Sequence, residues 1–171
     1  YTAISSHQSI SYRTAGGRYW KIFLNREFEN VSTSNKTKYI ANEIKNSIIV
    51  AILNSNLFWW YYVNYFDLYN LKDYMIFNFM YDDKQDENSR MLSNLGEQLM
   101  NSYECNKVIN RQFIQSRQQE TIFESFNPAK SKQIIDEIDK VLARHYGFTE
   151  EELDFIINYD IKYRMGDELN E

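Results

Sequence analysis

A stretch of 20 residues without a charged side chain, 47–66, constrains the fold of this chain more than any other feature: SIIVAILNSNLFWWYYVNYF. About 20 mainly apolar residues are also what a bilayer crossing needs. Here, however, Asn54, Ser55 and Asn56 stand at the midpoint, where unsatisfied amides are costly in lipid, and no cluster of Lys or Arg marks one end. We therefore interpret the stretch as a buried core helix running into an aromatic segment, and we expect no membrane association.

Composition restricts the class of protein further. The 171 residues are 43% apolar and 16% aromatic, which allows a buried core and excludes intrinsic disorder. The single cysteine, Cys105, excludes a disulfide framework, and with only two histidines a Cys- or His-based metal cluster is excluded too. A lone cysteine suits the reducing cytoplasm, where we place the protein. Because the sequence begins at Tyr1 without a secretory signal, we expect it to be a piece of a longer polypeptide.

The first part of the chain predicts a β-hairpin and then a helix. Residues Ser9–Leu24 hold two runs of β-forming side chains around Gly16-Gly17, a pair suited to a tight two-residue turn. Residues 30–38 are polar and predict a connector. From Tyr39 isoleucines recur every four residues, which predicts a helix with one apolar face: Ile40, Ile44, Ile48 and Ile52.

The second part predicts mainly helices. The charged segment 82–90 is the best internal boundary, and residues 92–108 and 111–120 both favour a helix. After the proline at 128, residues 131–159 predict an αα-hairpin.

Local signals define that αα-hairpin. Ser131 is expected to cap the first helix and Gly147 to end it in the left-handed conformation, and Thr149 is expected to cap the second helix.

Together these elements predict an α+β fold. An N-terminal antiparallel β portion and a central apolar helix precede a helical C-terminal half that ends in the αα-hairpin. We divide the chain into a β-rich recognition part at 1–80, a helical connector at 81–130, and the αα-hairpin with an acidic tail at 131–171, all within one compact fragment.

The sequence contains no recognisable catalytic motif. A nucleophilic serine or cysteine needs a base and an orienting group, and neither histidine lies in such a motif. The five glycines are too scattered for a phosphate-binding loop. Acidic residues of the C-terminal helices fit a solvated face. We therefore predict no catalytic, cofactor-binding or metal-binding residue in this chain.

Charge is divided unevenly and favours a binding function for the first part. Residues 1–80 hold 8 Lys or Arg against 5 Asp or Glu, whereas residues 81–171 hold 11 against 19. The run SYRTAGGRYWK at 11–21 combines cations with aromatic side chains, and a two-stranded ribbon of this kind can enter a DNA major groove. Spacing alone favours the alternative, in which the aromatic residues are core strand residues and the arginines are merely exposed.

Three segments resemble a known family. YRTAGGRYWKIF, AILNSNLFWWYY and IIDEIDKVLARHYGFTEEELDFIINYDIKYRMG occur in this order. They are similar to the C-terminal region of adenine-specific DNA methyltransferases of the type IIG restriction–modification kind, including the TaqI-like specificity domain. The resemblance covers most of the chain, and residues 81–120 lie outside it.

The resemblance implies a DNA target-recognition domain. In that family an upstream domain binds S-adenosylmethionine and holds a flipped adenine in an Asn/Asp-Pro-Pro-Tyr/Phe motif. The only proline here lies in the run NPAK at 127–130, which departs from that motif. Methyl transfer, and any cleavage of DNA, are therefore expected in other domains, with S-adenosylmethionine and magnesium as cofactors of the larger enzyme and none here.

The expected partners are double-stranded DNA and an upstream methyltransferase domain of the same polypeptide. The residues predicted to contact DNA are Arg13, Arg18, Tyr19, Trp20, Lys21, Lys36 and Lys38. The competing interpretation is a structural or protein-interaction module that does not bind DNA and packs on the catalytic domains, with the aromatic segment Leu57–Phe66 as its docking surface.

Overall fold

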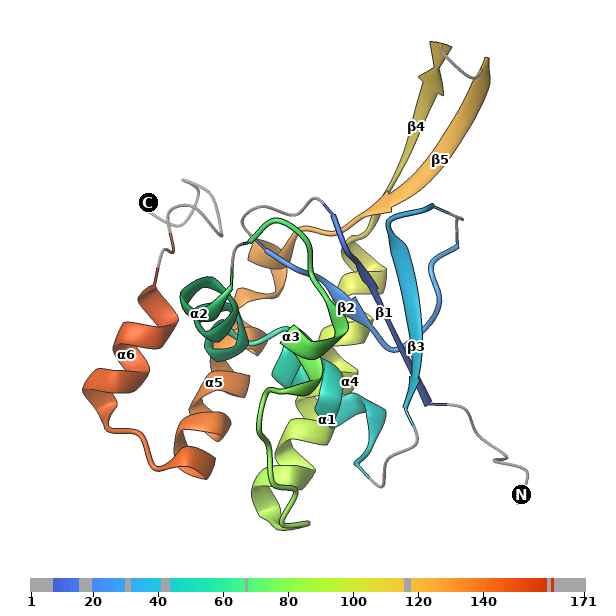
Figure 1. Cartoon of the computed structure of the whole chain (residues 1–171). Helices are drawn as coiled ribbons and strands as arrows, with labels where there is room; N and C mark the ends of the chain where they lie inside the picture. Colours follow the sequence, from blue (N-terminus) through green and yellow to red (C-terminus); the bar gives the residue numbers. More distant parts are fainter. Residues whose placement is uncertain are drawn as a thin grey trace, which may run out of the picture.

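The computed structural model describes residues 8–15, 20–29, 32–40, 44–66, 68–115, 118–159 and 161. Within these ranges the chain combines two antiparallel sheets with helices, which confirms the predicted α+β class (Figure 1). A three-stranded sheet and the helices make up the body of the molecule, and a two-stranded hairpin projects from it.

The three-stranded sheet has the order β2-β1-β3, with β1 (Gln8–Arg13) between β2 (Phe23–Leu24) and β3 (Asn35–Ile40). Antiparallel pairing of β1 with β2 confirms the two predicted hairpin strands, but their register differs from the prediction. Tyr12 pairs with Phe23, whereas a two-residue turn at Gly16-Gly17 requires that Tyr12 pair with Lys21. The glycine pair itself lies outside the described residues.

Strand β3 corrects two predictions, the polar connector at 30–38 and the helix from Tyr39. The central strand β1 needs hydrogen-bond partners on both edges, and β3 supplies them from Gln8↔Ile40 to Arg13↔Asn35. β3 lies at the edge of the sheet, where polar side chains are tolerated. Its polar composition therefore concealed the strand, and Ile40 belongs to the sheet rather than to a helix.

The charge-free stretch folds into two buried helices, α1 (Asn46–Leu53) and α2 (Asn56–Tyr65). The core location is as predicted, but one continuous helix is not. Asn54 bonds the backbone of β2, accepting from Phe23 N (3.1 Å) and donating to Phe23 O (2.8 Å). Ser55 caps α2 by accepting from Phe58 N (3.0 Å). No helix in the described part of the chain has the length and apolarity that a membrane span requires.

Helix α4 (Glu87–Asn106) confirms the helix expected at 92–108, but it begins inside the charged segment 82–90 and ends before Val108, which belongs to a strand. The short helix α3 (Asp73–Phe77) precedes it. Asp86 caps α4 by accepting from Ser89 N at 3.0 Å. Gly96 permits a close approach to α1, because a Cβ atom at this position would lie 2.0 Å from the carbonyl oxygen of Ser47.

The helix predicted at 111–120 is wrong, since this segment lies in a β-hairpin. Strand β4 (Val108–Ile114) pairs antiparallel with β5 (Gln119–Ser125) in a register that runs from Val108↔Ser125 to Ile114↔Gln119. Glutamines and arginines favour a helix locally, but helical propensity is a weak preference. Here β-branched and aromatic side chains on both strands, such as Ile109, Phe113 and Ile122, favour cross-strand pairing.

The predicted αα-hairpin is confirmed by α5 (Lys132–Tyr146) and α6 (Glu150–Asn158), which follow a short 3-10 helix, Pro128–Ser131. Gly147 ends α5 with a φ of 74°, and Thr149 and Glu152 form a capping box on α6. Ser131 stands at the N-cap of α5 but makes no capping bond; its Oγ lies 2.8 Å from Ser102 Oγ of α4.

One hydrophobic core joins the sheet to the helices. Its buried side chains come from all three parts into which the sequence was divided, 1–80, 81–130 and 131–171. They include Ile10, Phe23, Phe58, Leu99 and Ile138. The core therefore supports both the sheet and the foot of the projecting hairpin.

Candidate nucleic-acid interface

Of the seven residues predicted to contact DNA, two are buried and two lie outside the residues that the structure describes. Arg18 and Tyr19 are outside the described residues. Trp20 is buried and stacks on Trp59, with ring centroids 5.8 Å apart. Lys21 is only 6% exposed, with Nζ 5.9 Å from the ring centroid of Tyr62. Trp20 and Lys21 thus face the protein interior in this conformation.

The charged form of Lys21 is destabilised in that position. Burial lowers its pKa below the usual value, and the positive charge of Arg13 lowers it further. A side chain held in this way offers no exposed charge to a phosphate.

Lys36 and Lys38 lie on β3 and converge on one carboxylate. Lys38 Nζ is 2.6 Å from Asp73 Oδ2, Lys36 Nζ is 3.9 Å from Asp73 Oδ1, and Tyr12 donates its hydroxyl to Oδ1 at 2.6 Å. The bonds from Lys38 and Tyr12 lower the pKa of Asp73. The positive charge of these two lysines is therefore partly balanced within the chain.

Arg13 is exposed at the end of β1, on the opposite face of the sheet from the two lysines. It pairs with Asn35, while its neighbour Tyr12 pairs with Lys36, and successive residues of a strand point to opposite faces. The guanidinium of Arg13 has no hydrogen bond or ion pair with another residue of the described ranges. The structure therefore does not bring Arg13, Lys36 and Lys38 into one cluster.

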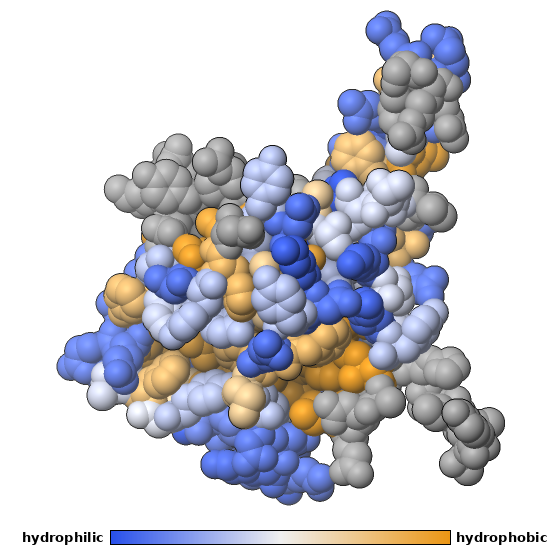
Figure 2. Space-filling view, viewed as in Figure 1, coloured by the Kyte–Doolittle hydropathy of each residue, from blue (hydrophilic) through white to orange (hydrophobic). Residues whose placement is uncertain are grey.

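The structure presents instead an element that sequence reasoning missed, the β4–β5 arm (residues 108–125). It extends away from the body (Figure 1), with hydrophilic residues towards its end and hydrophobic residues nearer its foot (Figure 2). Several large apolar side chains on it are exposed: Val108 53%, Ile109 47%, Phe113 58% and Ile122 45%. The polar side chains that are exposed on the described part of the arm are Arg111, Gln112, Gln115, Gln118, Glu120 and Ser125.

The two faces of the arm differ in chemistry. Residues directly opposite each other share a face, so Arg111 shares one with Ile122, and with Ile109 and Phe113 of its own strand. Gln112 shares the other face with Thr121. Apolar and β-branched residues on either side of the glutamine-rich segment 115–119 are a sequence signal for this ribbon. The helical propensity of the glutamines outweighed this signal in the prediction.

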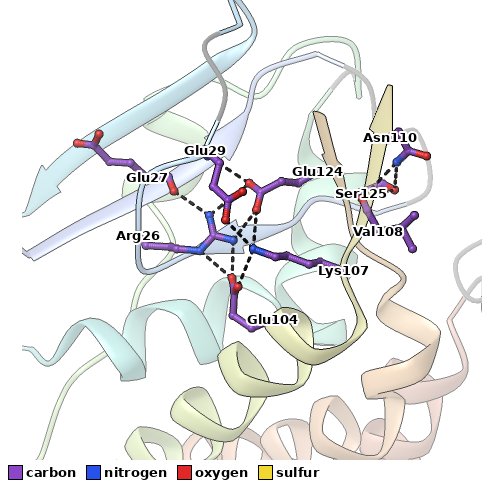
Figure 3. Close-up of polar contacts among 9 residues, drawn as sticks. All are labelled: Arg26, Glu27, Glu29, Glu104, Lys107, Val108, Asn110, Glu124 and Ser125. Carbon is purple, nitrogen blue, oxygen red and sulfur yellow. Dashed lines mark hydrogen bonds and ion pairs between the residues drawn. The ribbon is translucent and has the colours of Figure 1, made fainter. Parts of the chain in front are cut away.

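A network of charged side chains fixes the arm to the body (Figure 3). We name it the foot cluster, and its members are Arg26, Glu29, Glu104, Lys107 and Glu124. Arg26 follows β2, Glu104 lies on α4, and Glu124 lies on β5, so the cluster connects three elements.

Glu124 is the centre of the foot cluster. Its carboxylate accepts from Arg26 Nη2 at 2.7 Å, from Lys107 Nζ at 3.3 Å and from Glu29 N at 3.3 Å, and its side chain is 2% exposed. Burial alone would raise its pKa, but the bond from Arg26 and the other donors outweigh burial and hold the pKa below the usual value.

Arg26 and Lys107 complete the foot cluster on its other side. Arg26 Nε donates to Glu104 Oε1 at 2.7 Å, and Lys107 Nζ lies 2.9 Å from Glu104 Oε2 and 2.7 Å from Glu29 Oε1. The bond to Glu29 is the largest of the contributions that raise the pKa of Lys107. Every charge in the foot cluster thus has an opposite charge beside it, and the arm leaves the body at a fixed point.

The described residues offer no grouping of His, Cys, Asp or Glu suited to a metal ion. Asp139, the buried carboxylate of α5, serves the backbone of α2: it accepts from Leu57 N (3.0 Å) and from Asn56 N (3.0 Å) and Nδ2 (2.7 Å). Its geometry is that of a structural link between helices.

Comparison of the sequence with protein-family models, with curated proteins and with solved structures gives no significant match in any of the three. The resemblance to the type IIG methyltransferases therefore depends on the motifs in the sequence alone.

Proposed function

We propose that this chain is a DNA target-recognition module of a restriction–modification enzyme. It selects the site on the duplex, and other domains of the larger polypeptide carry out the methylation of adenine. The observation that carries the proposal is the projecting β4–β5 arm, a two-stranded ribbon held at its foot by paired charges. Ribbons of this kind are one of the few protein elements that a DNA groove accommodates.

The proposal assigns S-adenosylmethionine, and magnesium where cleavage occurs, to the other domains. The resemblance of the three sequence segments supports this division of roles. It is also physically sensible, because an enzyme that extrudes a base needs one part to grip the duplex while a separate pocket receives the base.

The test is binding of the chain to a duplex with a randomised centre, followed by selection of the bound molecules. We expect enrichment of a defined sequence, and we expect affinity to fall as salt rises, since phosphate contacts release counterions. Arg13→Ala should weaken binding and reduce the salt slope by about one unit. Arg144→Ala, which removes an exposed arginine near the end of α5, is the matched control.

Failure of the chain to retain any duplex at low salt would contradict the proposal. An unchanged salt slope in Arg13→Ala would remove that residue from the contact surface and leave the rest of the proposal in place.

A second candidate function is docking to another protein. The aromatic segment Leu57–Phe66 is poorly suited to docking, because several of its side chains are buried in the core of this chain: Leu57, Phe58, Trp59 and Tyr62. A more suitable surface is the exposed apolar groove that includes Ile76, Phe77 and Met80. This second function would be favoured if the chain binds a methyltransferase domain but does not bind DNA.

A further inference from the structure

We propose that the β4–β5 arm enters the major groove of DNA with the face of Arg111 towards the bases, and that Arg111 reads a base edge there. This inference rests on the proposed function, and it names the part of the molecule that makes the sequence-specific contacts. None of the residues involved belongs to the set that the sequence alone predicted.

The dimensions of the arm fit the groove. Paired strands lie about 4.8 Å apart, and the major groove is about 12 Å wide and about 8.5 Å deep, so a two-stranded ribbon with its side chains can be inserted. β4 has 7 residues, which rise about 23 Å. The arm can therefore reach the floor of the groove while its foot stays on the body.

The exposed side chains have the hydrogen-bonding chemistry of base readers. Arginine binds the O6 and N7 acceptors of guanine with two bonds, and glutamine binds adenine in the same way. Arg111, Gln112, Gln115 and Gln118 are all exposed. The guanidinium of Arg111 is exposed and has no hydrogen bond or ion pair with another residue in the ranges that the structure describes, so it is available to a ligand.

The arm is less acidic than the chain as a whole. Residues 108–125 hold two arginines and two glutamates, Glu120 and Glu124. Glu124, at the foot, is paired with Arg26 and Lys107. Glu120 is exposed opposite Phe113, and a glutamate at such a position can accept from the exocyclic amine of cytosine.

The exposed apolar side chains have a role in the same complex. An isolated two-stranded hairpin is marginally stable in water, so four exposed large apolar residues call for contact with a partner. Phe113 and Ile122 lie on the face of Arg111. In a major groove such side chains contact thymine methyl groups. Because the foot cluster already orients the arm, little conformational freedom remains to be lost on binding.

The experiment uses the duplex selected by the unaltered chain and compares Arg111→Ala with Gln112→Ala, on the other face of the same strand, and with Arg90→Ala. Arg90 is also exposed, but it lies in the first turn of α4, at the opposite end of this helix from the arm. We expect Arg111→Ala to bind roughly 10- to 100-fold more weakly and to lose preference at one base pair. Gln112→Ala should keep that preference, and Arg90→Ala should bind like the unaltered chain.

A change in the DNA tests the groove itself. Each guanine of the selected duplex is replaced in turn by 7-deazaguanine, which lacks the N7 acceptor of the major groove. At one position the replacement should weaken binding by the unaltered chain and have no further effect on Arg111→Ala, because the lost bond is the same in both cases. Circular dichroism and thermal unfolding confirm that each variant is folded.

The possible outcomes separate the inference from the function it rests on. If the unaltered chain selects a sequence and Arg111→Ala binds it equally well, Arg111 is not the reader but the proposed function stands. If Arg111→Ala binds every sequence more weakly without a change of preference, Arg111 contacts phosphate and base reading is overturned. If the unaltered chain self-associates in sedimentation, and Arg111→Ala keeps DNA binding but loses this self-association, the arm belongs to a protein interface. A chain that binds no duplex overturns both proposals.

Discussion

Asp139 is the residue on which the contact between α5 and α2 depends most. Its side chain is buried, and all three of its close partners are N–H donors of Asn56 and Leu57, at the start of α2. A carboxylate at this end of a helix also interacts favourably with the helix dipole. One acidic side chain thus replaces the hydrogen bonds that the first turn of α2 cannot make within the helix.

Asp139→Ala is expected to lower the free energy of unfolding by about 2–4 kcal/mol, because it leaves three buried donors without an acceptor. Urea unfolding measures the loss. Glu137→Ala on the exposed side of the same helix is the control and should change stability by less than about 0.5 kcal/mol. Equal stabilities of the two variants would contradict the structural role of Asp139.

The same residue makes stability depend on pH. Burial raises the pKa of Asp139 to about 7 in the folded chain, against about 3.9 for an aspartate in an unfolded chain. Between these values the folded state binds more protons than the unfolded state, so the contribution of Asp139 to stability is complete below about pH 4 and falls as pH rises towards 7. Above pH 7 it no longer changes.

Unfolding of the unaltered chain and of Asp139→Ala, measured between pH 4 and pH 8, isolates this effect. The difference in free energy of unfolding between them should decrease up to pH 7 and then stay constant. A difference that does not change with pH above about pH 5 would show that the carboxylate is ionised throughout that range and that its pKa is not raised.

At the scale of elements, the arm owes its orientation to the foot cluster. Glu124→Gln keeps an acceptor near Arg26 and Lys107 but removes the negative charge that both need. We expect a loss of about 1–3 kcal/mol in the free energy of unfolding. We also expect faster hydrogen exchange of the amides of β4 and β5 than in Glu120→Gln, a variant at an exposed position of the same strand. Exchange at the same rate in both variants would count against an anchoring role.

The elements that local signals define were predictable from the sequence. The stop at Gly147 and the cap at Thr149 act on their immediate neighbours, so the αα-hairpin could be recognised without knowledge of its surroundings. β3 and the β4–β5 arm were not predictable in this way, because their polar side chains favour a connector or a helix and only pairing with another strand decides the outcome.

The candidate site was less predictable than the fold for the same reason. Trp20 and Lys21 look like surface residues of a basic hairpin, but contacts with Trp59 and Tyr62, which are distant in sequence, bury them. Arg111 was overlooked because its exposure follows from an arm that sequence propensity did not reveal.

At the scale of the whole molecule, an acidic chain must approach DNA in a restricted orientation. The net charge is −5, so most of the surface is repelled by phosphates, and only a part that is locally free of carboxylates can come close. The arm comes nearest to this condition, since residues 108–125 hold two arginines against two glutamates, and it extends away from the body (Figure 1).

Helix α4 gives the molecule a rigid stem. Its 20 residues span about 30 Å, and Lys107 alone separates its last residue from the first residue of β4. Gly96 clamps the stem against the backbone of α1 at a contact too tight for any larger side chain. If a bound molecule tilts the hairpin, we therefore expect α4 to move with it. Because α4 is packed on α1, we expect the body to move as well.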